Sequence, residues 1–116
     1  MAQVERCDDV TVIHLDAAYE ALDQAKFEAA QQLLLGHAQT AEPPLVVLDL
    51  SQTAYMGSAF IEVMFRAWKR VADRDGKLVL CGVQPLCKEV LHTTRLDSMV
   101  QSFANVDDAV QGLRTG

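Results

Sequence analysis

A short apolar run near the middle of the chain constrains the fold more than any other feature. Residues 45–50 read Leu-Val-Val-Leu-Asp-Leu and carry one polar side chain among them. A strand with one face in water alternates apolar and polar residues, whereas this run is apolar at both odd and even positions. It therefore predicts a strand covered on both faces, as in a parallel sheet that lies between helices.

Strand and helix patterns alternate along the rest of the chain. Before the central run, we expect an edge strand around Val4, a strand at 10–15, and a helix at 24–37 with Asp23 as N-cap and Gly36 near its end. After it, we expect a helix from Ser58 that Gly76 ends, a strand at 77–83, a short helix from Pro85, a strand at 99–103 and a helix capped by Asn105. This alternation predicts an α/β class, with one domain over residues 1–116 and a mixed sheet covered by helices.

Two of these helices have apolar faces that predict how they pack. In the helix from Ser58, the broad apolar face consists of Ile61, Met64, Phe65, Trp68, Val71 and Ala72. In the short helix from Pro85, we expect the inward residues to be Leu86, Val90 and Leu91.

The charge of the chain limits its partners. Lys and Arg number 10 against 16 Asp and Glu, which gives a net charge of −6 at pH 7. Proteins that bind nucleic acid need clustered cations to displace counterions from the phosphates, so nucleic acid is excluded as a partner. A basic or mixed protein surface is the better candidate.

The sequence also lacks the patterns of membrane and metal proteins. No segment reaches the roughly 20 apolar residues that cross a bilayer, and the N-terminus does not read as a signal peptide, so we expect a cytoplasmic protein without direct membrane insertion. Cys7, Cys81 and Cys87 are odd in number and lack the spacing of zinc ligands, so we interpret them as reduced thiols. The three histidines are scattered, and no metal or cofactor is expected.

Ser58 lies where a helix begins, and two interpretations use that position. As a structural residue it is an N-cap whose oxygen accepts a backbone N–H bond, worth about 1 kcal/mol. As a functional residue it is a phosphoacceptor, because free N–H groups and the positive end of the helix dipole favour added negative charge. Phe60 borders this serine, and a partner contact there is an alternative to a role in the core.

No pattern of an enzyme accompanies this serine. The sequence Met56-Gly57-Ser58-Ala59-Phe60 does not match the Gly-x-Ser-x-Gly turn of serine hydrolases. Neither of the glycine-rich patterns that bind nucleotide phosphates is present. We therefore expect a binding protein and not an enzyme.

The order and spacing of several segments resemble the STAS domain, whose simplest members are bacterial anti-sigma-factor antagonists. The segments are Asp49-Leu50-Ser51, a serine seven residues further on, Gly76-Lys77-Leu78-Val79-Leu80, Pro85 and Val90-Leu91. The resemblance covers about residues 10–113. It implies a small mixed sheet of about five strands with helices packed mainly on one side.

The resemblance also implies a function. In antagonists the turn reads Asp-Ser-Ser-Gly-Leu, and an anti-sigma factor with serine kinase activity phosphorylates the first serine, which Ser58 matches. Phosphorylation releases the partner, and a phosphatase reverses the change. Leu22-Asp23 resembles the family's Leu-Asp pair, whose acidic residue lies close to the phosphorylation site. The implied partner interface therefore includes Asp23, Gly57, Ala59 and Phe60.

The turn departs from the family pattern, which keeps a second function open: Ile61 conservatively replaces Leu, and three other replacements are larger changes. Gly57 replaces Asp, Ala59 replaces the second Ser, and Phe60 replaces Gly. A partner surface that does not switch has no need of the kinase's recognition turn. The alternative is a constitutive STAS scaffold or subunit of a larger assembly, such as the soluble component of a lipid-transporting ABC system.

Overall fold

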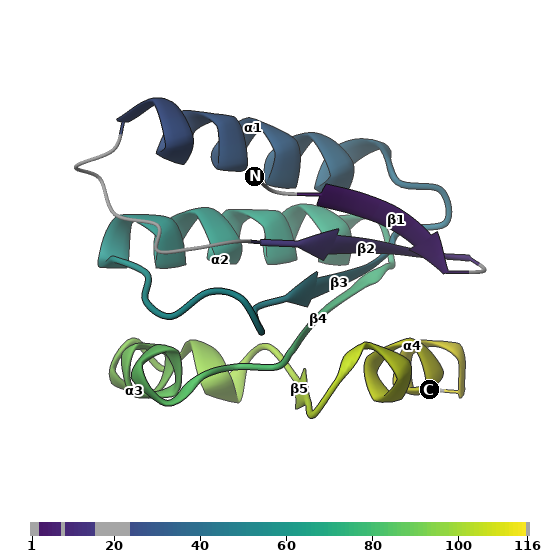
Figure 1. The fold of residues 1–116 in the computed structure, drawn as a ribbon. Coiled ribbons are helices and arrows are strands. Elements are labelled where there is room, and N and C mark those ends of the chain that lie inside the picture. Colours follow the sequence, from purple (N-terminus) through teal and green to yellow (C-terminus); the bar gives the residue numbers. More distant parts are fainter. Residues whose placement is uncertain (1–2, 8, 16–23, 116) are drawn as a thin grey trace.

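The computed structural model describes residues 3–7, 9–15 and 24–115, which form a five-stranded sheet with helices on both faces (Figure 1). The elements, in chain order, are β1 (Gln3–Cys7), β2 (Val10–His14), α1 (Gln24–Thr40), β3 (Leu45–Asp49), α2 (Ser58–Asp73), β4 (Lys77–Cys81), α3 (Pro85–Thr93), a 3-10 turn (Leu96–Ser98), β5 (Ser102–Phe103) and α4 (Val106–Thr115). The predicted α/β class is confirmed.

The sheet is mixed, and its strands follow the order of the sequence. The spatial order is β1-β2-β3-β4-β5, in which β1 is antiparallel to β2 and the other pairs are parallel. The predicted edge strand around Val4 is β1. The apolar run is β3 at the centre, where Val46, Val47 and Leu48 are fully buried. The absence of alternation in this run therefore has the predicted cause, which is cover on both faces.

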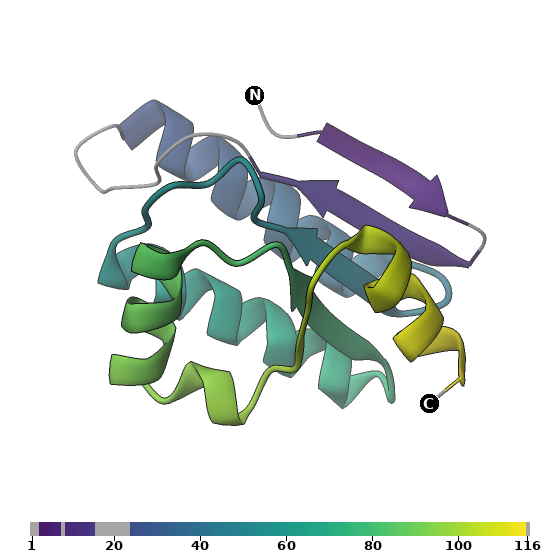
Figure 2. The ribbon, with the colours of Figure 1, turned by 60° about the horizontal axis from the view of Figure 1, so that its bottom comes forward.

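Helices divide unequally between the two faces of the sheet. The first and second helices lie on one face, and α3 and the 3-10 turn extend the same apolar core. On the other face, α4 packs Ala109, Val110 and Leu113 against Val10, Val12, Val47 and Val79. Figure 2 shows α4 in front of the sheet, with α1 and α2 behind it. Helices thus lie mainly on one side, as the family resemblance implies.

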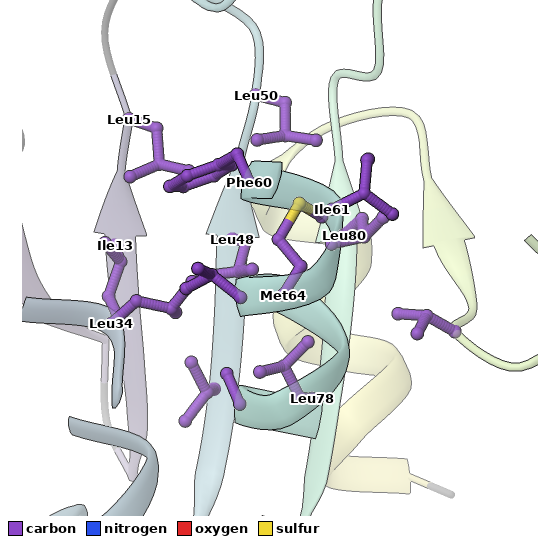
Figure 3. Packing of buried hydrophobic residues seen from close by; sticks show 14 of the residues in the cluster. Ile13, Leu15, Leu34, Leu48, Leu50, Phe60, Ile61, Met64, Leu78 and Leu80 are labelled. Atoms are coloured by element: carbon purple, nitrogen blue, oxygen red, sulfur yellow. The ribbon is translucent and has the colours of Figure 1, made fainter. Parts of the chain in front are cut away.

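Helix α2 holds the larger core together. Phe60, Met64, Ala67 and Val71 recur at intervals of four, three and four residues, so they lie on one face of the helix, and all are buried. Figure 3 shows Phe60 and Met64 among side chains of the sheet, including Leu48 and Leu80. Trp68 is half-buried against this core, but Phe65 is 37% exposed, so its predicted inward position is wrong.

The sequence predicts that Gly76 ends helix α2, but a different residue ends it. The left-handed residue that ends the helix is Asp75, with φ of 59°, and not a glycine. Gly76 follows and its N–H donates to the carbonyl of Val71 at 2.9 Å. A Cβ at Gly76 would lie 2.0 Å from the carbonyl oxygen of Pro44, so glycine is required by the close approach of the two backbones.

Several other boundaries differ from the predictions. The first helix continues through Gly36 to Thr40, so the glycine does not end it, and a Cβ at this position would meet no other atom. In α3, Leu91 is buried and Val90 packs against the core, but Leu86 is 55% exposed and its predicted inward position is wrong. The predicted strand at 99–103 shortens to β5, because the chain first makes a 3-10 turn that leaves Met99 exposed.

The last helix begins as its sequence predicts. The side-chain oxygen of Asn105 accepts a hydrogen bond from the N–H of Asp108 at 2.9 Å, which is the geometry of an N-cap. Asp107 and Asp108 in the first turn complement the helix dipole.

Candidate functional site

The turn between β3 and α2 presents Ser58 at the first helical position. The N-cap is Gly57, with φ of −81° and ψ of 167°, and no side chain caps the helix. The carbonyl of Gly57 accepts hydrogen bonds from the N–H groups of Phe60 at 3.0 Å and Ile61 at 3.2 Å. The predicted N-cap role of Ser58 is therefore wrong: the helix begins one residue earlier than that role requires. The exposed serine is not used as a cap.

This helix N-terminus is open to an anion. A helix of 16 residues directs its positive dipole end toward Ser58, and its first turn holds no acidic side chain. The first N–H groups of a helix have no partner within the helix, and here no side-chain cap satisfies them. A negative group attached at Ser58 would gain about 0.3–1 kcal/mol from the dipole in an exposed setting.

Buried residues fix the turn that carries this serine. Thr53 is fully buried; its N–H donates to the carbonyl of Leu50 at 3.0 Å, and its hydroxyl donates to the carbonyl of Leu15 at 3.2 Å. The thiol of Cys87 in α3 donates to the carbonyl of Thr53 at 3.4 Å. Met56 is also fully buried. Ser58 therefore stands on a segment anchored to both the sheet and α3.

The residues predicted to surround Ser58 at a partner interface have different positions. Ala59 is exposed and Gly57 is half-buried, so both can be approached. Phe60 is fully buried, and its ring packs edge-on against Phe27 of α1 with centroids 5.9 Å apart and planes at 80°. The predicted partner contact at Phe60 is therefore wrong. Asp23 lies outside the described residues.

A row of polar side chains crosses the sheet at the carboxyl ends of the parallel strands. His14 and Asp49 are direct neighbours on β2 and β3, and Cys81 is the neighbour of Asp49 on β4. The imidazole Nδ1 of His14 lies 2.7 Å from Oδ2 of Asp49, and its Nε2 lies 2.7 Å from Oε1 of Glu5. The other oxygen of Asp49 accepts the N–H of Ser51 at 3.0 Å, at the start of the turn that leads to Ser58.

The electrostatics of this row follow from its contacts. Burial alone would lower the pKa of His14, but hydrogen bonds to Glu5 and Asp49 and their negative charges raise it above its ordinary value. Burial alone would raise the pKa of Asp49, but hydrogen bonds from Ser51 and His14 lower it. Burial, together with the charge of Asp49 and the hydrogen bond to it, raises the pKa of Cys81 to about 12. This thiol is neutral at physiological pH.

Sequence reasoning missed this row because its members are far apart in the chain. The separation of His14 from Asp49 is 35 residues, and only the register of two parallel strands brings them together. The available signal was the position of Asp49, a polar residue at the end of a strand that is otherwise apolar.

The described residues also bear on metal binding and on membrane insertion. They contain no group of three or more His, Cys, Asp and Glu side chains placed to hold a metal ion. No helix within 3–7, 9–15 and 24–115 combines the length and apolar character that a bilayer crossing requires.

Comparison with known proteins identifies the family. The family model of the STAS domain matches residues 1–109, so the chain belongs to the STAS domain family. An anti-sigma-factor antagonist (STAS) domain protein from Planctomyces limnophilus is 30% identical and superimposes with a TM-score of 0.82 over 97% of each chain. An anti-sigma factor antagonist from Mycobacterium paratuberculosis shares the fold at 22% identity and a TM-score of 0.80, over 98% of this chain and 93% of that one.

A transporter also contains a related segment. The proposed sulfate transporter YvdB of Bacillus subtilis (strain 168) is 29% identical over 87 residues, which are 73% of this chain and 16% of the transporter. This chain therefore spans only a small part of that protein's length. Sequences similar to this chain thus occur both in an anti-sigma-factor antagonist (STAS) domain protein and as a segment of a larger protein.

Proposed function

We propose that this chain is a regulatory binding protein of the anti-sigma-factor-antagonist type. It binds an anti-sigma factor with serine kinase activity while Ser58 is free, releases it when Ser58 is phosphorylated, and is reset by a phosphatase. The observation that carries the proposal is the exposed Ser58 at the first position of α2, on an anchored turn and at a helix N-terminus that no side chain caps.

Phosphorylation at this position acts on the surface and leaves the fold in place. A phosphate adds about −1.5 to −2 charges and three acceptor oxygens, and the open N–H groups of α2 are its nearest favourable partners. The helix is therefore stabilised by the modification. A partner surface selected for a neutral hydroxyl meets a new charge instead, so the complex dissociates while the domain remains folded.

The surface that meets the partner differs from the one expected from sequence. Tyr55, three residues before Ser58, is 37% exposed, and Ala59, directly after it, is also exposed. Leu86 at the start of α3 is 55% exposed, and its neighbour Cys87 bonds to the turn through the carbonyl of Thr53. We assign the partner contact to Tyr55, Ala59 and Leu86 in place of Phe60. Apolar and aromatic side chains are the usual anchors at the centre of an interface.

Phosphorylation by a purified anti-sigma serine kinase tests the switch. The protein is incubated with the kinase of its own organism and ATP, and phosphopeptides are located by mass spectrometry. We expect phosphate on Ser58, none in Ser58→Ala, and full modification of Ser51→Ala, a matched control at an exposed serine of the same turn. Ser58→Asp is expected to remain folded and to lose kinase binding. Absence of phosphate from Ser58, under conditions that modify another antagonist, rejects the switch.

A constitutive subunit is the second candidate function. It is favoured by the related segment in YvdB and by Gly57 and Ala59, which replace the family's Asp and Ser. Under this function Ser58→Asp leaves complex formation unchanged, and Leu86→Ser weakens it. Measuring both variants against the same partner separates the two candidates.

A further inference from the structure

The interaction of His14 with two carboxylates has a consequence that does not depend on the proposed function. Both ring nitrogens of His14 lie 2.7 Å from a carboxylate oxygen, Nδ1 from Asp49 on β3 and Nε2 from Glu5 on β1. A carboxylate oxygen accepts hydrogen bonds and donates none, so both contacts are hydrogen bonds only when both nitrogens carry a proton. The geometry is therefore that of an imidazolium ion.

The two carboxylates are not equivalent. The side chain of Asp49 is 11% exposed, and its second oxygen is held by the N–H of Ser51. The side chain of Glu5 is 54% exposed, and β1 is an edge strand with four of its five residues exposed. Loss of its hydrogen bond to His14 therefore costs more free energy for Asp49, which is buried, than for Glu5, which water can solvate. When the imidazolium loses one proton, Nδ1 keeps its proton for Asp49, and Nε2 is left with a lone pair that faces Glu5.

Among the residues that the structure describes, the charged groups that contact the ring of His14 are these two carboxylates, although other charged groups lie nearby. Arg6 on β1 faces the opposite side of the sheet, where its guanidinium donates to Thr11 and to the carbonyl of Glu42. On β4, Cys81 contacts Asp49 as a neutral thiol. On α4, Asp107 lines the same depression as Asp49, so the negative charge of this helix adds to that of the row.

We propose that His14 is a pH-sensitive clamp that fastens the edge strand β1 to the carboxyl end of β3. In the protonated state the ring bridges Glu5 and Asp49. Deprotonation at Nε2 releases a proton to water and repels the Glu5 carboxylate, which turns to solvent. The strand β1 then keeps its ladder to β2 and the hydrogen bond from Arg6 to the carbonyl of Glu42 but loses its tie to β3, while Asp49 still holds Ser51 and the turn toward Ser58 in place.

Ring-nitrogen NMR on the intact protein tests the site of deprotonation. The pH titration of ¹⁵N-labelled protein is expected to show that His14 loses its Nε2 proton, with a pKa above the ordinary value of about 6.5. Glu5→Gln keeps the size of the side chain and removes its charge, so it lowers this pKa toward the ordinary value. His92→Gln is the matched control, because His92 also contacts a carboxylate, Asp97 at 3.0 Å, but lies exposed on another part of the surface.

Amide hydrogen exchange measures the clamp itself. After correction for the intrinsic effect of pH, the protection of β1 amides is expected to fall as pH rises through the pKa of His14. The protection factor of these amides should fall tenfold for each pKa unit by which His14 in the parent exceeds His14 in Glu5→Gln. Protection that stays constant with pH, loss of the proton from Nδ1, or a pKa at or below about 6.5 would each overturn the proposal. The parent protein alone decides all three, whatever the folding of the variant.

Discussion

Phe60→Ala is expected to lower the free energy of unfolding by about 3–5 kcal/mol. The side chain is fully buried, and its ring packs edge-on against Phe27 at 5.9 Å. The substitution removes that apolar burial, removes an aromatic contact worth about 0.5–1.5 kcal/mol, and leaves a cavity between α1, α2 and the sheet. At about 4 °C for each kcal/mol in a domain of this size, the melting temperature falls by roughly 12–20 °C.

Urea unfolding followed by the fluorescence of Trp68, the single tryptophan of the chain, measures this change. The slope of the transition should remain that of the parent. Phe65→Ala is the control in the same helix: its side chain is 37% exposed and stacks on Trp68 at 5.9 Å, so we expect a loss below about 1.5 kcal/mol. If Phe60→Ala lost less than about 1 kcal/mol but bound its partner poorly, the burial argument would be refuted and Phe60 would return to the interface.

Four other substitutions or conditions have expected outcomes. Gly76→Ala places a Cβ 2.0 Å from the carbonyl oxygen of Pro44 and should cost about 1–3 kcal/mol in urea unfolding. The thiol of Cys81, with a pKa of about 12, should resist a thiol reagent at pH 8 in the folded protein and react once urea unfolds it. Because the folded-state pKa of His14 is raised, its stabilising effect is complete below about pH 6.5 and is lost as pH rises through the folded pKa. The difference in unfolding free energy between the parent and His14→Gln should therefore shrink at high pH. Asp49 has the opposite sign: its pKa is lowered, so its contribution is lost as pH falls below about 3.9 and through the folded pKa.

The architecture was predictable because local patterns carry the information that determines it. A strand without alternation must be covered on both faces, and β3 is central for that reason. Asn105 follows an apolar segment and precedes an acidic turn, and it caps α4 as such a sequence predicts. Two of the failures concern short elements. Leu86 lies in the nine-residue helix α3, and the segment at 99–103 leads into the two-residue strand β5, and there the packing of neighbours decides exposure more than periodicity does.

The candidate site was predictable only in part. Ser58 was located correctly at the start of a helix, but a shift of one residue moved the N-cap to Gly57. Phe60, offered as a partner contact, is buried, and Phe65, predicted inward, is exposed, and the spacing of buried residues in the helix explains both. Buried residues of α2 begin at Phe60 and recur through Met64, Ala67 and Val71, a spacing that leaves Phe65 outside the stripe. The pairing of His14 with Glu5 and Asp49 depends on strand register, which sequence periodicity does not determine.

The replacement of the family's Asp by Gly57 changes what phosphorylation does to this helix. In a turn with Asp at the N-cap, a carboxylate already accepts the first N–H groups, and a phosphate on the next residue competes with it. Here Gly57 has no side-chain acceptor, so the N–H groups of Ser58 and Ala59 at the start of α2 are not capped by it and can be reached by a phosphate on Ser58. The replacement of Asp by Gly57 therefore removes the acidic residue of the family's turn and, at the same time, leaves N–H donors from which a phosphate on Ser58 can accept hydrogen bonds. Under the proposed switch, added charge at Ser58 strengthens the helix, so we expect release of the partner to arise from repulsion across the interface and not from local unfolding.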